Sequence, residues 1–174
     1  SGNNFYDLTI NNSNTTEKVS AQGSSLVVSN HLNIADGIFE SASDYHDVTI
    51  ATGSSLQLTG DITVSGNWTN NGTFVHNNHN VTFDGSTAQS ISGITFFYNL
   101  TINNSSSEIT LNNGIVVLGT LNLTNGIVNQ NNLYPLEIRN GATAINASNS
   151  SHTYNGGLTK WFNNLNPFTY PVGD

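Results

Sequence analysis

The sequence predicts an all-β protein built as a parallel β-solenoid, and three observations support this prediction. Short triplets of the form apolar–polar–apolar recur along the 174-residue chain, and such alternation is typical of a half-buried strand. Five triplets are followed by a glycine, and these glycines recur at a nearly constant spacing. Asn, Ser and Gly dominate between the triplets and favour turns, whereas helical spacing is not sustained. We therefore expect about five to six rungs, each with three short strands in about 30 residues.

The first strand of each expected rung precedes the spaced glycine. The phrases are Val19–Gly23, Val48–Gly53, Val81–Gly85, Ile109–Gly114 and Leu136–Gly141. Because side chains alternate between the two faces of a strand, the apolar residues are expected to point inward. The polar residues between them should point outward and form one file, which contains Ser20, Thr49, Thr82, Thr110 and Glu137.

The second and third strands follow each glycine at regular intervals. The second is expected at 32–34, 62–64, 94–96 and 121–123, and the third at 38–39, 68, 100–102 and 127–128. In the triplet 94–96, Ile94 and Phe96 are expected to point inward, as in the other triplets.

One phrase occurs twice: Phe5–Ser13 reads FYDLTINNS and Phe97–Ser105 reads FYNLTINNS. We place both copies in the third strand column, about three rungs apart. The Asn-Asn-Ser that ends each copy is expected to turn a corner. The early copy begins late in a rung, so we expect the chain to be a segment of a longer rod. The expected inward residues are Leu8, Ile10, Leu100 and Ile102, and the outward ones are Thr9 and Thr101.

A β-sandwich is the alternative fold, since turn signals every 8–12 residues also suit it. The spaced glycines, the Asn-rich turns and the shortness of the triplets favour the solenoid. We assign residues 1–150 to the solenoid repeats. Residues 151–174 are rich in aromatic side chains and contain two of the three prolines, so we assign them to a C-terminal cap or the start of the next module.

The phrases FYNLTINNS, EITLNNGIVVLGTLNLTNGIV, LEIRNGATAI and FTYPVGD carry a resemblance. Together they resemble the repeat region of large secreted, adhesin-like surface proteins of the Bacteroidetes, which are type IX secretion substrates. The resemblance covers Phe5 to Gly173 and departs from the family where Tyr170 stands in place of the usual Phe. It implies an extracellular β-solenoid displayed at the bacterial cell surface, and it carries over no catalytic residue.

Charged side chains are few: three Lys or Arg against eleven Asp or Glu, for a net charge of −8. Lys18, Arg139 and Lys160 are scattered and form no basic patch, so we expect no nucleic-acid partner. No apolar run approaches the roughly 20 residues that span a bilayer, so we expect no membrane insertion. The chain has no cysteine and therefore no disulfide framework.

Two clusters could hold a cation. Asp44, His46 and Asp47 suit a cation or acid–base site, or alternatively a charged excursion between rungs. We favour the excursion because no second acidic cluster is expected one or two rungs away in the same column. His76 and His79 lack a third ligand. With so few basic residues to stabilise developing charge, we expect no enzyme activity, no metal and no cofactor.

The aromatic residues of the tail are the second candidate site. Exposed rings can stack on sugars, so these residues suit a carbohydrate platform; alternatively they cover the open end of the solenoid, which we favour. The residues are Tyr154, Trp161, Phe162 and Tyr170.

The sequence therefore predicts a structural or adhesive segment of an extracellular surface protein, a stiff rod that stacks end to end into fibres. The alternative is a carbohydrate-binding module on a β-helix scaffold. A polysaccharide lyase-like enzyme and ice binding by the outward threonines are lesser alternatives. The expected partners are other copies of the chain, through end-to-end or lateral association, or surface glycans.

Overall fold

The computed structural model describes residues 3–14, 16–21, 26–148, 150–162 and 168–172. These residues form three sheets and no helix, so none of them belongs to a helix able to cross a membrane. The eleven-stranded sheet contains β1 (Asn3–Asn11), β3 (Leu26–Asp36), β5 (Asp44–Ile50), β7 (Ile62–Val64), β8 (Trp68–Asn70), β10 (Asn80–Phe83), β11 (Gln89–Ser92), β13 (Asn99–Leu111), β15 (Thr120–Asn129), β17 (Thr143–Ile145) and β18 (Thr153–Tyr154). The four-stranded sheets contain β2 (Lys18–Ser20), β4 (Ile38–Ser41), β6 (Ser55–Leu58) and β9 (Thr73–Val75), and β12 (Thr95–Phe97), β14 (Ile115–Val117), β16 (Leu136–Ile138) and β19 (Leu158–Lys160).

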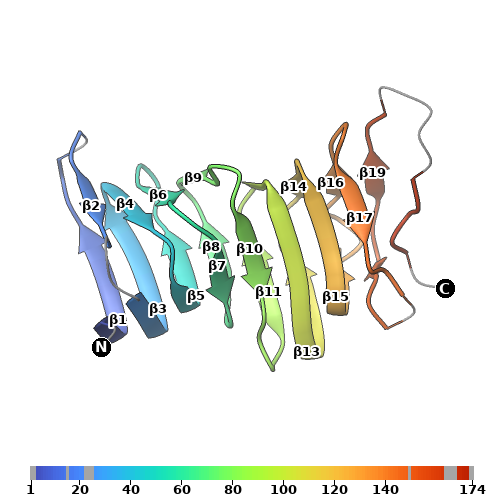
Figure 1. Ribbon diagram of the computed structural model, residues 1–174, viewed down its shortest axis with the longest axis horizontal. Helices are drawn as coiled ribbons and strands as arrows, with labels where there is room; N and C mark the ends of the chain where they lie inside the picture. The colour runs from blue at the N-terminus through green and yellow to red at the C-terminus, as the bar shows by residue number, and fades with distance from the viewer. Residues whose placement is uncertain (1–2, 15, 22–25, 149, 163–167, 173–174) are drawn as a thin grey trace.

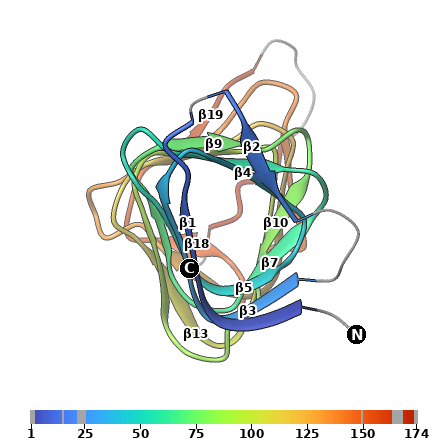
Figure 2. The same ribbon diagram turned by 90° about the vertical axis from the view of Figure 1, so that its left-hand side faces the viewer.

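The strands coil into a parallel β-solenoid of about eight turns, which confirms the predicted fold class (Figure 1). Every pairing between these strands is parallel. Viewed from the N-terminal end, the turns superimpose as a ring (Figure 2). In order, the turns consist of β1–β2, β3–β4, β5–β6, β7–β9, β10–β12, β13–β14, β15–β16 and β17–β19.

Each turn is shorter than the predicted repeat. Val64, Phe83 and Ile102 are stacked in register, one on each of three successive turns. The hydrogen bond between Asn80 and Asp61, on two of these turns, joins residues that lie 19 positions apart in the chain. Other such bonds between adjacent turns join residues 20 or 21 positions apart. The expectation of five to six rungs was therefore wrong, because the chain makes about eight shorter turns.

The spaced glycine phrases mark successive sides of the coil. The triplet 81–83 belongs to β10, at the start of its turn. The next triplet, 109–111, lies at the end of β13, and the one after it, 136–138, forms β16 in a different sheet. The interval between phrases thus corresponds to about one and a half turns. The glycines do mark chain reversals, but such reversals occur at several corners of each turn of the coil. The spacing between these glycines is therefore not the length of one turn. Gly23, which ends the first phrase, lies outside the described residues.

The repeated phrase also occupies two different sides of the coil. Leu8 lies in the second half of strand β1 and pairs with Leu32 of β3, whereas Leu100 lies at the start of strand β13 and pairs with Val81 and Leu121. The expected orientation is nevertheless found. Ile10, Leu100 and Ile102 are buried, Leu8 packs against the core, Thr9 is exposed and Thr101 is half-buried.

Aromatic side chains fill the middle of the apolar column. The ring of Trp68 lies 5.0 Å from that of Phe74, 6.5 Å from that of Phe83 and 5.8 Å from that of Phe97. Trp68, Phe83 and Phe97 have no exposed surface. Burial of one such ring stabilises the fold by about 1.5–3 kcal/mol, so these rings contribute strongly to the stability of the middle turns.

Buried amide side chains satisfy the backbone at the corners, where the strand ladder is interrupted. Gln89 donates from Nε2 to the carbonyl oxygens of Val64 and Gly66, at 3.0 and 2.6 Å. Its Oε1 accepts from the backbone N of Gly85 and from Asn104 Nδ2, at 3.1 and 3.0 Å. Unpaired buried carbonyls are costly, which explains why polar residues stand inside these corners.

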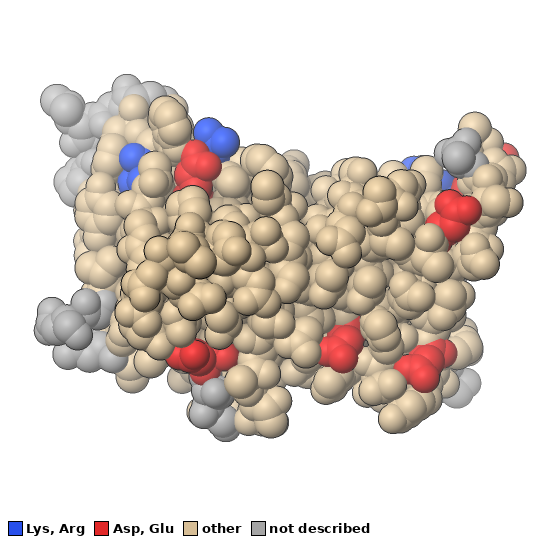
Figure 3. Space-filling model, turned by 180° about the vertical axis from the view of Figure 1, so that it is seen from behind, with Lys and Arg blue, Asp and Glu red and all other residues tan. Residues whose placement is uncertain are grey.

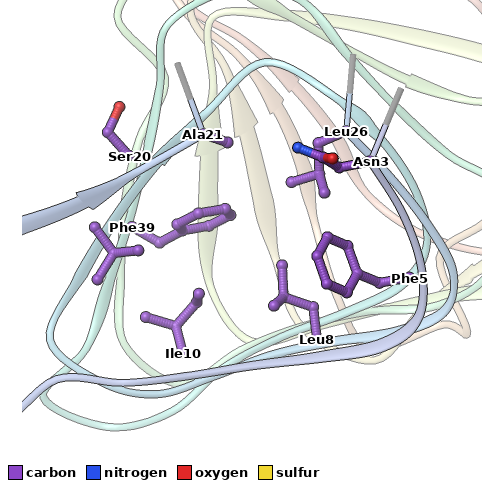
Figure 4. A pocket seen from close by; sticks show the side chains of 9 residues that line it. Asn3, Phe5, Leu8, Ile10, Ser20, Ala21, Leu26 and Phe39 are labelled. Atoms are coloured by element: carbon purple, nitrogen blue, oxygen red, sulfur yellow. The ribbon is translucent and has the colours of Figure 1, made fainter. Parts of the chain in front are cut away.

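The two ends of the coil differ. At the N-terminal end, a hollow of about 240 Å³ is lined mainly by apolar side chains, among them Phe5, Leu8, Leu26 and Phe39 (Figure 4). At the C-terminal end, Phe168 packs against the core, and the Thr153 backbone N donates to the Pro171 carbonyl oxygen at 2.7 Å. The eighth turn includes β18 and β19, which pair with β15 and β16, so the expected boundary at residue 150 falls within this turn.

Candidate functional site

The predicted cation cluster lies on β5, but its members serve separate partners. Asp44 Oδ1 accepts a hydrogen bond from Thr63 Oγ1 at 2.8 Å. Asp47 Oδ1 accepts from the backbone N of Asn67 at 2.6 Å and lies 3.4 Å from His46 Nδ1. Both carboxylates thus tie the third turn to the fourth. Within the described ranges, no three His, Cys, Asp or Glu side chains are grouped so that they could hold a metal ion.

Asp44 shares a hollow with Asp84, which the repeat pattern of the sequence did not place near it. The hollow measures about 370 Å³, and Thr63 and Ser65 line it between the two carboxylates. Burial raises the pKa of Asp84, and the negative charge of Asp44 raises it further, against a backbone hydrogen bond that lowers it. The two carboxylates belong to the third and fifth turns. A prediction made with the correct number of residues per turn would therefore have placed them near each other.

The two histidines of HNNHN face different neighbours. The ring of His76 stacks on Tyr98 with centroids 5.5 Å apart, and its Nδ1 accepts from the backbone N of Asn78 at 3.0 Å. Burial lowers the pKa of His76. His79 Nδ1 lies 3.6 Å from Asp61 Oδ1. These contacts give each histidine a structural role at the corner between β9 and β10.

The predicted single file of outward threonines does not exist. Thr49 pairs with Asn33 and Thr69, whereas Thr82 pairs with Thr63 and Thr101 on another side of the coil. The error follows directly from the wrong period. These threonines therefore do not form the single outward file on which the suggestion of ice binding depended.

The tail aromatics separate into three groups and do not form a common platform. Tyr154 donates from its hydroxyl to Glu108 Oε2 at 2.6 Å, which lowers the pKa of Glu108 and raises the pKa of Tyr154. Phe162 and Tyr170 each pack edge-on against Phe168, at 6.1 and 5.2 Å between centroids. Lys160 Nζ lies 5.0 Å from the Phe168 ring centre, so this second group is built around a cation–π contact.

Trp161 forms the third group with two charged residues of the seventh turn. Its indole Nε1 donates to Glu137 Oε1, and the Arg139 guanidinium lies 5.6 Å from the ring centre. Arg139 also pairs with Glu137 at 3.1 Å. The backbone explains this placement, since Trp161 N donates to the Ile138 carbonyl oxygen at 3.0 Å and thereby continues the ladder beyond β19.

A groove adjoins this group on the outer face of β12, β14 and β16. It measures about 350 Å³, and its lining includes Ile94, Phe96, Val116, Glu137 and Arg139. Phe96 pairs with Val116 and Val116 with Glu137, so these three form one outward file across successive turns.

The orientation of Ile94 and Phe96 is opposite to the prediction. Ile94 is 66% exposed and Phe96 is 45% exposed, whereas Thr95 between them has no exposed surface. Thr95 Oγ1 is satisfied inside the coil by Trp68, Asn70 and the carbonyl oxygen of Gly93. The inward triplet is therefore 95–97, shifted by one residue, and such a shift exchanges the two faces of a strand. The adjacent apolar residues of ITFF concealed this shift.

No protein-family model, curated protein or solved structure matches the chain. Among the hollows of the described surface, two bear on function: the acidic hollow of Asp44 and Asp84, and the largely apolar groove beside the Glu137–Arg139 ion pair and the exposed Trp161.

Proposed function

We propose that this chain is a structural and adhesive segment of an extracellular bacterial surface protein, in which it serves as a stiff rod. Parallel strand pairing joins each turn to the next, over about eight turns around one apolar column, and this supports the proposal. Each inner turn is paired on both sides, so bending the coil would break ladder bonds and expose apolar side chains. The resemblance of its repeated phrases to adhesin-like surface proteins supports the extracellular location.

Association through the N-terminal end is part of this proposal. Among the described strands, β1 pairs only with β3, so no described strand lies along its other edge. Beside that edge, the apolar hollow exposes Phe5 and Leu8 to the end of the coil (Figure 4). A second copy of this chain would bring a matching edge and a matching apolar surface, which together cover both features.

The opposite end favours a pairing of N-terminal ends over a continuous fibre. Phe168 and Pro171 already lie against the last turn. Head-to-tail stacking would displace them, whereas contact between two N-terminal ends would not. The proposal therefore predicts a dimer, and it predicts fibres only when the tail is removed.

Sedimentation velocity over a range of concentrations tests this association. Phe5 lines the hollow and its neighbour Tyr6 does not, although Tyr6 is 71% exposed. We expect concentration-dependent dimers in the wild type and in Tyr6→Asp, and monomers in Phe5→Asp. Because both side chains are exposed, both variants should keep the wild-type melting temperature at concentrations low enough for the wild type to be monomeric. A wild-type chain that stays monomeric at every concentration would contradict the association.

A further inference from the structure

We infer that the groove beside Trp161 binds neutral carbohydrate, with one sugar ring over Phe96 and a neighbouring ring toward Trp161. This inference goes beyond the role as a rod and does not depend on it. It concerns a side face of the fifth to eighth turns, remote in the fold from the hollow at the first turn.

The groove is built by three successive turns. Val116 of the sixth turn forms the floor, and although it points outward, only 6% of its surface is exposed. Ile94 and Phe96 of the fifth turn stand on one side, and Pro135 of the seventh turn stands on the other. The volume of about 350 Å³ lies at the lower end of the range for small-molecule sites, about 300–1,000 Å³.

The side chains that line the groove are largely apolar, whereas most outward-facing side chains of this protein are polar. Trp161 is 52% exposed, which is comparable to Phe96, and it stands against the two charged residues that close the groove. Exposed aromatic and aliphatic side chains gathered at one place on a polar surface mark a contact site. Figure 3 shows how sparse charged side chains are on one face of the molecule.

The polar groups at the rim define the chemistry of the ligand. Glu137 and Arg139 lie 3.1 Å apart, and their side chains are 20% and 41% exposed. The carboxylate still offers acceptor positions and the guanidinium still offers donors, which suits the paired hydroxyls of a sugar. The C–H faces of the same sugar ring suit Phe96 and Val116.

Charge decides between neutral and acidic sugars. The two charges at the groove cancel each other, and the chain as a whole carries a net charge of −8. An acidic polysaccharide would meet repulsion from the protein, and the guanidinium at this site is already paired with Glu137. The groove therefore fits a short stretch of neutral glycan.

Tryptophan fluorescence provides the test, because Trp68 is fully buried and Trp161 is the exposed member of the two tryptophans. The full chain is titrated with cellohexaose, xylohexaose, laminarihexaose and mannohexaose, and with hexagalacturonate as the acidic probe. We expect saturable binding of at least one neutral probe. Phe96→Ala and Trp161→Ala should each weaken that binding by about tenfold or more, and Tyr6→Ala in the first turn should not change it. Binding to Trp161→Ala is followed by calorimetry, since that variant lacks the reporter.

Several outcomes would overturn the inference. One is that no neutral probe binds, and another is that only the acidic probe binds. If Phe96→Ala keeps the wild-type affinity, the groove does not bind the sugar, and any sugar site lies on the C-terminal tail alone. A change in sedimentation of Phe96→Ala, without sugar, would show that a second copy covers the groove. Because Phe96 and Trp161 are exposed, unchanged melting temperatures will distinguish lost binding from lost folding.

Discussion

Trp68 and Thr95 are joined inside the core by a hydrogen bond from the indole Nε1 to the threonine Oγ1, at 3.2 Å. Thr95 also accepts from Asn70 Nδ2 at 3.2 Å, so one hydroxyl satisfies two buried donors. This bond links the fourth turn to the fifth. It also sets which face of β12 is buried, and thereby turns Phe96 outward.

Removal of this hydroxyl should destabilise the protein. Thr95→Val keeps the shape of the side chain but leaves the indole N–H without its partner, which costs about 1–3 kcal/mol. The free energy of unfolding, measured with urea, should fall by that amount. Thr69→Val, an outward and half-buried threonine, is the matched control and should change it by less than about 0.5 kcal/mol. Equal effects of the two substitutions would contradict the buried role of Thr95.

The local orientation at Thr95 shows what the sequence could and could not reveal. Alternating triplets correctly identified strands, the solenoid class and inward residues such as Leu100 and Ile102. The apolar residues at 94, 96 and 97 allowed two orientations. The choice depended on a partner, Trp68, that lies 27 residues earlier, and local alternation carries no such information.

The period of the coil was harder to predict than its strands. Several corners in each turn of the coil carry Gly or Asn. The glycines chosen as markers lie at different corners, so the distance from one to the next spans about one and a half turns. The Asp44 and Asp84 pair was missed for the same reason, because the column assignment separated two residues that share a hollow. The groove was missed because it needs both the correct period and the correct orientation of Phe96.

Inward and outward positions should differ sharply in their tolerance of substitution. Leu111→Asp places an unpaired charge in the core, where Leu111 has no exposed surface, and should prevent folding. Thr110→Ser, at the adjacent outward position, should change the free energy of unfolding by less than about 0.5 kcal/mol. Circular dichroism and thermal melting measure both variants. Similar tolerance at the two positions would contradict the assigned orientation.

Tyr45 should make the protein sensitive to alkaline pH. Its hydroxyl donates to Ser41 Oγ, and burial raises its pKa from 10.0 to about 12. The unfolded chain therefore loses this proton at lower pH than the folded chain does. Stability from this difference is complete below pH 10 and is lost as pH rises toward 12. The loss should be on the order of 2–3 kcal/mol.

Urea unfolding between pH 8 and pH 12 measures this effect. Tyr45→Phe should remove this part of the pH dependence, because phenylalanine carries no proton to lose. If Tyr45→Phe shows the same decline as the wild type, the alkaline sensitivity arises elsewhere.

Glu108 should contribute to stability above its ordinary pKa. The Tyr154 hydroxyl and Asn129 donate to its carboxylate and lower its pKa below 4.5. A lowered pKa in the folded state gives stability that is present above pH 4.5 and lost as pH falls through the lowered value. Carboxyl chemical shifts measured by NMR should show Glu108 titrating below the usual range. In Tyr154→Phe the pKa should rise toward 4.5, and an unchanged pKa would contradict the contact.

Engineered cysteine pairs test the central claim, the short period of the coil, most directly. The chain has no native cysteine. Thr82 and Thr101 are paired neighbours on adjacent turns, and adjacent strands place Cα atoms about 4.8 Å apart, within disulfide range. Thr82→Cys with Thr101→Cys should therefore form a disulfide under mild oxidation, as detected by mass spectrometry. Thr82→Cys with Thr110→Cys should not, because Thr110 pairs with Ser90 and Asn129 on another side. Cross-linking of the second pair and not of the first would contradict the coil described here.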